Sequence, residues 1–170
     1  MKVAIYGQGY SHEVRGPVET LLDELADHQA VVAIEEDFAR FLELEGRTTH
    51  SFTLEGGLDA SFDLFVSFGG DGTILRAITY IRDLGVPIVG VNTGRLGFLS
   101  TCQKEQVREM IREFALGNYR LVERSLVTAS LVEAPEGHEN LNFALNEVTV
   151  SRKDTTSMIT VETYLNEEYL

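Results

Sequence analysis

The chain lacks several features that define large classes of proteins. It contains a single cysteine, Cys102, which excludes a disulfide within the chain and is typical of a reducing compartment. No apolar run approaches the roughly 18 residues that a membrane-spanning helix needs. The first residues, MKVAIYGQG, are typical of a strand and carry no signal-peptide pattern, so we expect a cytoplasmic protein.

Basic residues are also scarce. The 170 residues include 14 lysines and arginines against 27 aspartates and glutamates, which gives a net charge of −13. This balance argues against a general surface for nucleic acid or anionic membrane. A phosphate ligand would have to be attracted by local geometry or by a metal ion.

The common phosphate and metal motifs are missing. Gly7-x-Gly9 would need a third glycine at position 12 to form the dinucleotide fingerprint, and that residue is His12. No GxxxxGKS or GxxxxGKT loop, CxxC pair or HExxH segment occurs. The histidines have no metal-ligand spacing, and the sequence predicts no metal-binding side chains.

Most of the chain before Gly117 alternates between strand and helix patterns. Apolar runs of strand length occupy residues 2–6, 30–34, 62–68 and 86–91. Apolar residues at helical spacing occur in four segments: one that begins at Pro17, one around residues 37–44, and two over residues 73–82 and 103–116. Residues 45–61 have no clear period and are predicted as loops. The alternation predicts an α/β fold, a Rossmann-like domain with a parallel sheet and helices on both faces.

The pattern changes near residues 118–123. Segments 119–133, 143–152 and 157–165 read as strands with no helix between them, and residues 164–170 read as a hairpin. We therefore predict an α/β domain over 1–120 and the start of an antiparallel, sandwich-like β domain over 121–170. Because the last strand has barely begun at Leu170, we expect the chain to be a fragment.

The strongest functional signal is the segment Gly69-Gly70-Asp71-Gly72-Thr73, which lies between a buried strand and a helix. Its glycines allow a sharp turn, and exposed N–H groups there suit phosphate oxygens. The Asp71 carboxylate, with an ordinary pKa of about 3.9, could deprotonate a hydroxyl that attacks a phosphoryl group, or hold a metal ion. The alternative is that Asp71 only caps the helix.

Two further segments carry weaker signals. In Asn92–Leu99, Phe98 could stack on a base and Arg95 could meet a phosphate, although a plain loop with a core phenylalanine explains the pattern equally well. In the predicted strand 144–150, a period of two places Asn146 on an apolar face, where its amide needs a partner. The alternative is that Asn146 has a structural role, with its amide hydrogen-bonded within the protein, and that the Glu147 side chain lies in solvent.

Together these segments resemble one family, the ATP-dependent NAD kinases. GGDGT at 69–73, NTGRLGF at 92–98 and ALNEVTV at 144–150 match the family in order and spacing, over residues 1–165. The GGDG part is shared with lipid kinases and phosphofructokinases. The TGxLGF pattern and the Asn-Glu pair are what distinguish NAD kinases from them.

The resemblance implies roles for particular residues. Asp71 would accept the proton of the adenosine ribose 2′-hydroxyl of NAD, which attacks the γ-phosphate of ATP to give NADP. Nucleotide-binding roles are implied for Gly70, Asp71, Gly72, Thr73, Arg76, Phe98, Asn146 and Glu147. The resemblance also implies a divalent ion, most simply magnesium, and a homodimer or homotetramer. The family's downstream Thr-Ala-Tyr-Ser-type segment is not in this sequence.

Two alternatives remain open at the level of sequence. A lipid or sphingoid kinase would share the GGDGT loop, although the acidic balance counts against it. A non-catalytic nucleotide-binding sensor would keep the loop without transferring phosphate.

Overall fold

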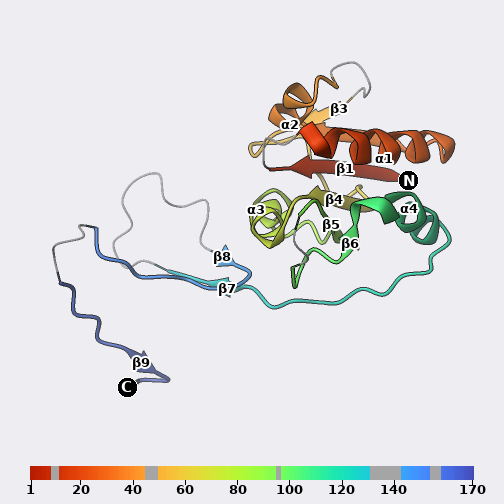
Figure 1. The fold of residues 1–170 in the computed structure, drawn as a ribbon. Coiled ribbons are helices and arrows are strands. Elements are labelled where there is room, and N and C mark those ends of the chain that lie inside the picture. The colour runs from red at the N-terminus through yellow and green to blue at the C-terminus, as the bar shows by residue number, and fades with distance from the viewer. Residues whose placement is uncertain (9–11, 45–49, 95–96, 131–142, 154–157) are drawn as a thin grey trace. The chain divides into compact units, whose positions relative to one another are not determined.

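The computed structural model describes residues 1–8, 12–44, 50–94, 97–130, 143–153 and 158–170. The chain forms two compact units, Met1–Ser125 and Leu126–Leu170 (Figure 1). The sequence-based division into domains 1–120 and 121–170 stays a prediction.

The first unit is built on a six-stranded parallel sheet. Its strands lie in the order β3-β2-β1-β4-β5-β6. They are β1 (Lys2–Gly7), β2 (Val31–Glu35), β3 (His50–Phe52), β4 (Leu64–Phe68), β5 (Ile88–Asn92) and β6 (Cys102–Gln103). The order reverses between β1 and β4, and open α/β sheets bind ligands at the carboxyl ends of the strands beside such a switch point.

Helices cover both faces of this sheet. They are α1 (Arg15–Asp27), α2 (Glu36–Phe41), α3 (Asp71–Ile81) and α4 (Val107–Ala115). Alternate residues of β1 point to opposite faces: Val3 and Ile5 pack in the core with α1 and α4, and Ala4 and Tyr6 pack with α3. Figure 1 shows α1 and α3 on opposite sides of β1. The prediction of a Rossmann-like α/β fold with a parallel sheet is confirmed.

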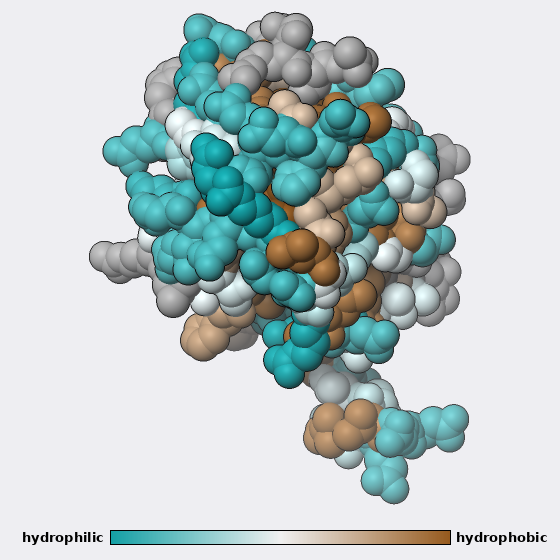
Figure 2. All heavy atoms as spheres, turned by 90° about the vertical axis from the view of Figure 1, so that its right-hand side faces the viewer, coloured by the Kyte–Doolittle hydropathy of each residue, from teal (hydrophilic) through white to brown (hydrophobic). Residues whose placement is uncertain are grey.

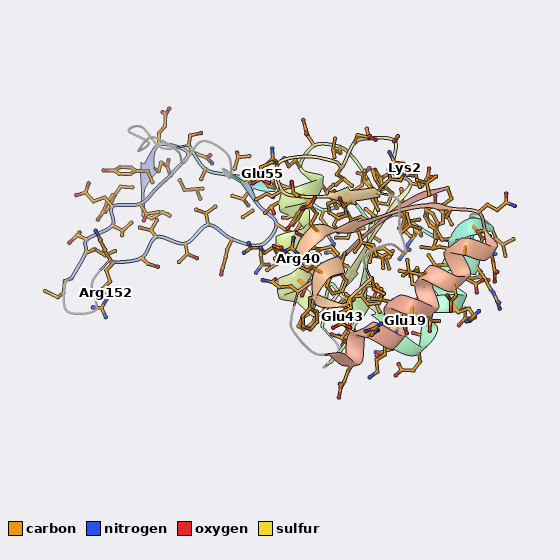
Figure 3. All side chains as sticks on the ribbon, turned by 90° about the horizontal axis from the view of Figure 1, so that it is seen from above. Lys2, Glu19, Arg40, Glu43, Glu55 and Arg152 are labelled. Atoms are coloured by element: carbon orange, nitrogen blue, oxygen red, sulfur yellow. The ribbon has the colours of Figure 1, made fainter. Side chains whose placement is uncertain are left out.

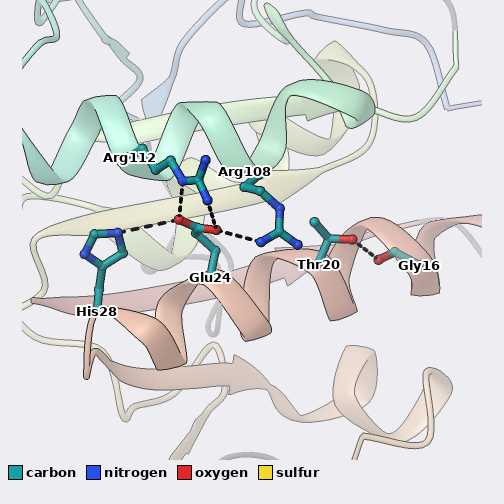
Figure 4. A network of polar contacts seen from close by, with 6 residues as sticks. All are labelled: Gly16, Thr20, Glu24, His28, Arg108 and Arg112. Carbon is teal, nitrogen blue, oxygen red and sulfur yellow. Dashed lines mark hydrogen bonds and ion pairs between the residues drawn. The ribbon is translucent and has the colours of Figure 1, made fainter.

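A buried carboxylate joins α1 to α4 (Figure 4). Glu24 of α1 is 2% exposed, and its carboxylate accepts hydrogen bonds from Arg108 at 2.9 Å and from Arg112 at 2.7 and 3.4 Å. His28 lies 3.7 Å from the same carboxylate. Arg112, and then Arg108, lower the pKa of Glu24 against the opposing effect of burial.

Two short strands were not predicted. β3 lies inside the segment 45–61 that the sequence predicts as loops, and only Phe52 of its three residues is buried. β6 has two residues, both half-buried. Neither strand contains an apolar run long enough to produce a sequence signal, and each is formed by pairing at an edge of the sheet.

The second unit has much less strand than the sequence predicts. Its strands pair as two antiparallel ribbons, β7 (Val127–Thr128) with β8 (Phe143–Ala144) and β9 (Tyr164–Leu165) with β10 (Glu168–Tyr169). The predicted long strands at 119–133, 143–152 and 157–165 are therefore wrong over most of their described residues. Apolar side chains there, such as those of Val150 and Met158, are exposed, so the alternating pattern is not matched by burial.

The predicted hairpin at the end of the chain is confirmed. Asn166 and Glu167 connect β9 to β10 with φ angles of 50° and 71°. Positive φ at both central residues is the geometry of the tight turn that matches the twist of a two-residue hairpin, and asparagine tolerates it well.

The surface of the chain is predominantly hydrophilic on the face drawn in Figure 2. Many of the charged side chains spread over the first unit in Figure 3 are paired, and Arg15 lies 3.0 Å from Glu19 and 3.4 Å from Glu43. In the part of the chain that the structure describes, no helix is long and apolar enough to cross a membrane.

Candidate functional site at the carboxyl edge of the sheet

The turn between β4 and α3 brings Asp71 to the carboxyl edge of the sheet. Gly69 has φ +151°, and a side chain there would overlap the side chain of Thr73. Gly70 is the N-cap residue of α3, and Asp71 is the first residue of the helix. The alternative in which Asp71 caps the helix is therefore wrong: a glycine occupies the cap position, and the Asp71 carboxylate has other partners.

Those partners are three consecutive backbone N–H groups. Phe98 N donates to Asp71 Oδ2 at 2.8 Å, and Leu99 N and Ser100 N donate to Oδ1 at 2.9 and 3.0 Å. We call these donors, residues 98–100, the amide cradle. The N–H groups of Ser100, Leu99 and Phe98, in that order, lower the pKa of Asp71, because each stabilises the ionised form.

The close approach that forms the cradle depends on Gly97. A Cβ atom at this position would overlap the carboxyl group of Asp71. The sequence shows that Gly97 allows a turn, but it does not show which group the glycine admits. Leu99 and Ser100 were not predicted as site residues, because a backbone donor leaves no signature in the identity of its side chain.

The cradle leaves Asp71 with remaining acceptor capacity. A carboxylate offers about four lone-pair sites, and the three N–H groups use two on Oδ1 and one on Oδ2. The residue is partly exposed. An ionised carboxylate of this kind can accept a hydrogen bond from a hydroxyl group and orient its oxygen, and it can take up the proton as the oxygen forms a new bond.

The other predicted residues of this region differ in their exposure. Gly72 and Arg76 are exposed on α3, and Thr73 is buried against Gly69. The Phe98 side chain is 94% exposed, so the alternative of a core phenylalanine is wrong, and the ring is accessible for stacking. Arg95 lies outside the described residues.

A cavity of about 180 Å³ lies along α3 at the same edge of the sheet. Among the predicted site residues that the structure describes, only Arg76 lines this cavity. The residues around it come from the ends of β1 and β2 and from α2 and α3: Tyr6, Gly7, Gln8, Glu35, Asp37, Phe38, Phe41, Arg76 and Tyr80.

Among the lining residues that sequence reasoning missed, Glu35 carries a buried carboxylate. It ends β2, is 7% exposed, and accepts the Phe38 N–H at 2.9 Å as the N-cap of α2. Burial raises the pKa of its carboxyl group, against the effect of this N–H. An acidic residue at the junction of an apolar run and a helical pattern was the available signal.

Asn146 and Glu147 belong to the second unit. Both are exposed and follow β8, which ends at Ala144. The expectation of a buried amide on an apolar strand face is therefore wrong, because the strand ends before Asn146 and the amide is available to solvent.

No resident metal site is formed by the residues that the structure describes. They contain no group of three or more histidine, cysteine, aspartate or glutamate side chains that could hold an ion. The carboxylate of Asp71 instead faces N–H donors. The described side chains therefore do not by themselves complete a set of ligands for a divalent ion.

Comparisons with known proteins agree on one family. Residues 14–119 match the model of the ATP-NAD kinase N-terminal domain. The chain is 45% identical to an NAD kinase of Flavobacterium johnsoniae and 36% identical to one of Bacteroides fragilis. These alignments cover all of this chain, but only 59% and 58% of the relatives, so the chain spans about three-fifths of their length.

A solved structure gives the same result for the fold. Yeast NADH kinase, crystallised with NADH, matches with a TM-score of 0.59 over 74% of this chain and 41% of its own, at 20% identity. At this low identity, the likeness shows only that the two chains share the arrangement of strands and helices. With the whole chain aligned to relatives named NAD kinase, the lipid-kinase alternative is not favoured. The chain belongs to the NAD kinase family.

Proposed function

We propose that the complete protein phosphorylates NAD, transferring the γ-phosphate of ATP to the 2′-hydroxyl of the adenosine ribose to give NADP. The observation that carries this proposal is the Asp71 carboxylate, which is held ionised at the carboxyl edge of the sheet with an acceptor site free for a hydroxyl group. Membership of the NAD kinase family supplies the two substrates.

In this proposal Asp71 orients the attacking hydroxyl. The 2′-oxygen forms a bond to the γ-phosphorus, the bond between that phosphorus and the β,γ-bridging oxygen breaks, and ADP leaves. The proton of the hydroxyl passes to Asp71 and then to solvent. Because the cradle lowers the pKa of Asp71, we expect the proton to move late, when the attacking oxygen has lost most of its basicity.

The remaining predicted residues bind the nucleotides in this proposal. The backbone N–H groups of Gly70 and Gly72 at the N-terminus of α3 and the guanidinium of Arg76 contact phosphates, since N–H groups and cations are suited to anions. Thr73, whose N–H donates to the Gly70 carbonyl oxygen at 3.0 Å, supports this turn from within. Phe98 stacks on the adenine. Asn146 and Glu147 bind ribose hydroxyls.

Three further expectations belong to the complete protein. A magnesium ion would arrive bound to the triphosphate of ATP and offset its charge, which suits a chain of net charge −13. The family resemblance supports a homodimer or homotetramer. The single cysteine supports action in the reducing cytoplasm.

Replacement of Asp71 by asparagine tests the proposal. In the complete protein we expect Asp71→Asn to lower kcat at least about a hundredfold, the usual scale for loss of a general base, while the dissociation constant for NAD changes little. NADP formation would be followed in a coupled dehydrogenase assay and NAD binding by calorimetry.

Asp83→Asn is the matched control, because Asp83 is an exposed aspartate just beyond the end of α3. It should keep the activity of the wild type. Near-normal turnover of Asp71→Asn would remove Asp71 from the reaction. A wild type that binds NAD but forms no NADP would instead support the nucleotide-sensor alternative.

A further inference from the structure

We infer that Ser100 is a positioning residue for Asp71: its side-chain hydroxyl locks the Gly69–Asp71 turn to the amide cradle. The inference rests on the proposed function, since it assigns Ser100 to the reaction that Asp71 would assist. No sequence pattern pointed to this residue, which lies two positions beyond the end of the TGxLGF pattern.

Ser100 holds the turn at two points. Its Oγ donates to the carbonyl oxygen of Gly69 at 3.0 Å, and its backbone N–H donates to Asp71 Oδ1 at 3.0 Å. One residue therefore fixes both the backbone that leads into Asp71 and the carboxylate itself. These two partners, Gly69 and Asp71, are two residues apart in sequence. The two bonds therefore fix the position of the carboxylate relative to the backbone of its own turn.

Burial distinguishes Ser100 from the other two members of the cradle. Ser100 is 0% exposed, whereas Phe98 is 94% exposed and Leu99 is partly exposed. A cradle built from exposed loop residues alone would hold the carboxylate only as firmly as the loop is held. Because a hydrogen bond is more restrictive away from water, the buried Ser100 hydroxyl attaches this loop to the backbone of the turn independently of the Asp71 carboxylate.

Glycines make this attachment possible from both sides. A Cβ atom at Gly90, in β5, would lie 2.8 Å from Ser100 Cα and 3.0 Å from Ser100 Oγ. On the other side, Gly97 admits the Asp71 carboxylate. Strand β5, the Gly69–Asp71 turn and the loop that carries Ser100 therefore approach one another closely. A residue larger than glycine at position 90 or 97 would prevent this approach, which fixes the position of the Ser100 hydroxyl.

The consequence for the reaction is geometric. Attack on a phosphoryl group requires the hydroxyl oxygen in line with the leaving group, and a displacement of about 1 Å can cost about a hundredfold in rate. Without the Ser100 hydroxyl, the cradle holds the turn through the Asp71 carboxylate but no longer through the Gly69 carbonyl oxygen, and the carboxylate is less well placed. The binding of ATP and NAD through other groups is retained.

The experiment removes this hydroxyl in the complete protein. Ser100→Ala deletes it, and Ser100→Cys keeps a side chain in the space but provides a weaker donor. The control is Ser67→Ala: Ser67 is a 1% exposed serine of β4 whose hydroxyl has no hydrogen-bond partner among the described residues. We would measure kcat, the KM values for NAD and ATP, and the thermal denaturation midpoint of each variant.

We expect Ser100→Ala to lower kcat about 10- to 100-fold with both KM values within about twofold of the wild type. Ser100→Cys should lose most of the same activity while remaining folded at the assay temperature. Ser67→Ala should keep the kcat of the wild type. If Ser100→Ala does not fold, the kcat of Ser100→Cys alone decides whether the Ser100 hydroxyl positions Asp71.

Two results would overturn the inference while leaving the proposed function intact. One is a folded Ser100→Ala protein with wild-type kcat. The other is full activity of Ser100→Cys, which would mean that Ser100 only fills space. A wild type that fails to phosphorylate NAD would overturn the proposed function, and the inference with it.

Discussion

Backbone groups, not side chains, determine the state of the one carboxylate on which the proposed reaction depends. Asp71 has no cationic partner in the described part of the chain; its charge is balanced by three N–H dipoles from the loop after β5. Such donors hold an anion without adding a mobile cation that would compete for phosphate. The arrangement suits the proposed binding of phosphorylated ligands by a chain of net charge −13.

This dependence on the backbone makes Gly97 a sensitive position. We expect Gly97→Ala to displace the Asp71 carboxylate, because the added methyl group overlaps it, and to lower the free energy of unfolding by about 1–3 kcal/mol, the usual cost of overpacking. The proposed kinase activity should fall as well. Urea denaturation and the coupled assay measure the two effects.

The control for this substitution lies in the same loop. Among the described residues, a Cβ atom added at Gly94 would have no neighbour within 4 Å, and the backbone there does not have a positive φ. Gly94→Ala should therefore change the free energy of unfolding by less than about 0.5 kcal/mol. Equal effects of the two substitutions would show that any side chain in the loop is disruptive, and would remove the specific role of Gly97.

At the level of elements, the contact between α1 and α4 combines apolar packing with the Glu24 network of Figure 4. Glu24 is almost fully buried, whereas the side chains of Arg108 and Arg112 are 46% and 57% exposed. The arginines therefore keep contact with water while they satisfy the buried carboxylate. This arrangement avoids the desolvation of both partners that makes fully buried ion pairs costly.

We expect Glu24→Gln to lower the thermal denaturation midpoint by several degrees, because the neutral amide loses the charge-assisted bonds to both arginines. Circular dichroism on heating measures the shift. Glu19→Gln is the control, since Glu19 lies on the same helix and forms an exposed ion pair with Arg15, a type that contributes little. A shift no larger than that of the control would mean that the network does not stabilise the contact.

At the level of the whole molecule, the two units differ in how their backbone is protected. Strands β1, β4 and β5 lie inside the sheet and are largely buried, whereas β9 and β10 have two exposed residues each. An isolated two-stranded hairpin is at best marginally stable in water. In the described part of the chain, the buried apolar clusters on the two faces of the sheet belong to Met1–Ser125.

Hydrogen exchange on this chain should reveal the difference. We expect amides in β1 and β4 to exchange only through global unfolding, and those in β9 and β10 to exchange at rates close to those of an unstructured peptide. Mass spectrometry of peptic fragments after deuterium labelling measures both. Equal protection of β9 and β1 would contradict the weak stability inferred for the second unit.

The sequence predicted the first unit well because its main signals are local. Apolar runs such as Phe62–Phe68 are long enough to identify central strands, and the helix over 73–82 follows from spacing alone. The same method failed after Gly117. There an alternating pattern predicted long strands, but a strand also needs a partner, and residues such as Val148 and Val150 are exposed with no pairing in the described part.

By itself the sequence determined the parallel α/β architecture, the placement of GGDGT at the carboxyl edge of the sheet, and the family resemblance through three short motifs. These features depend on side-chain identity and on spacing along the chain. Only the tertiary structure decided what Asp71 contacts, that Ser100 joins its turn to the cradle, and that Glu24 meets arginines of a distant helix. Such contacts join residues far apart in sequence, several through backbone groups that nearly every residue type carries, so no sequence pattern could specify them.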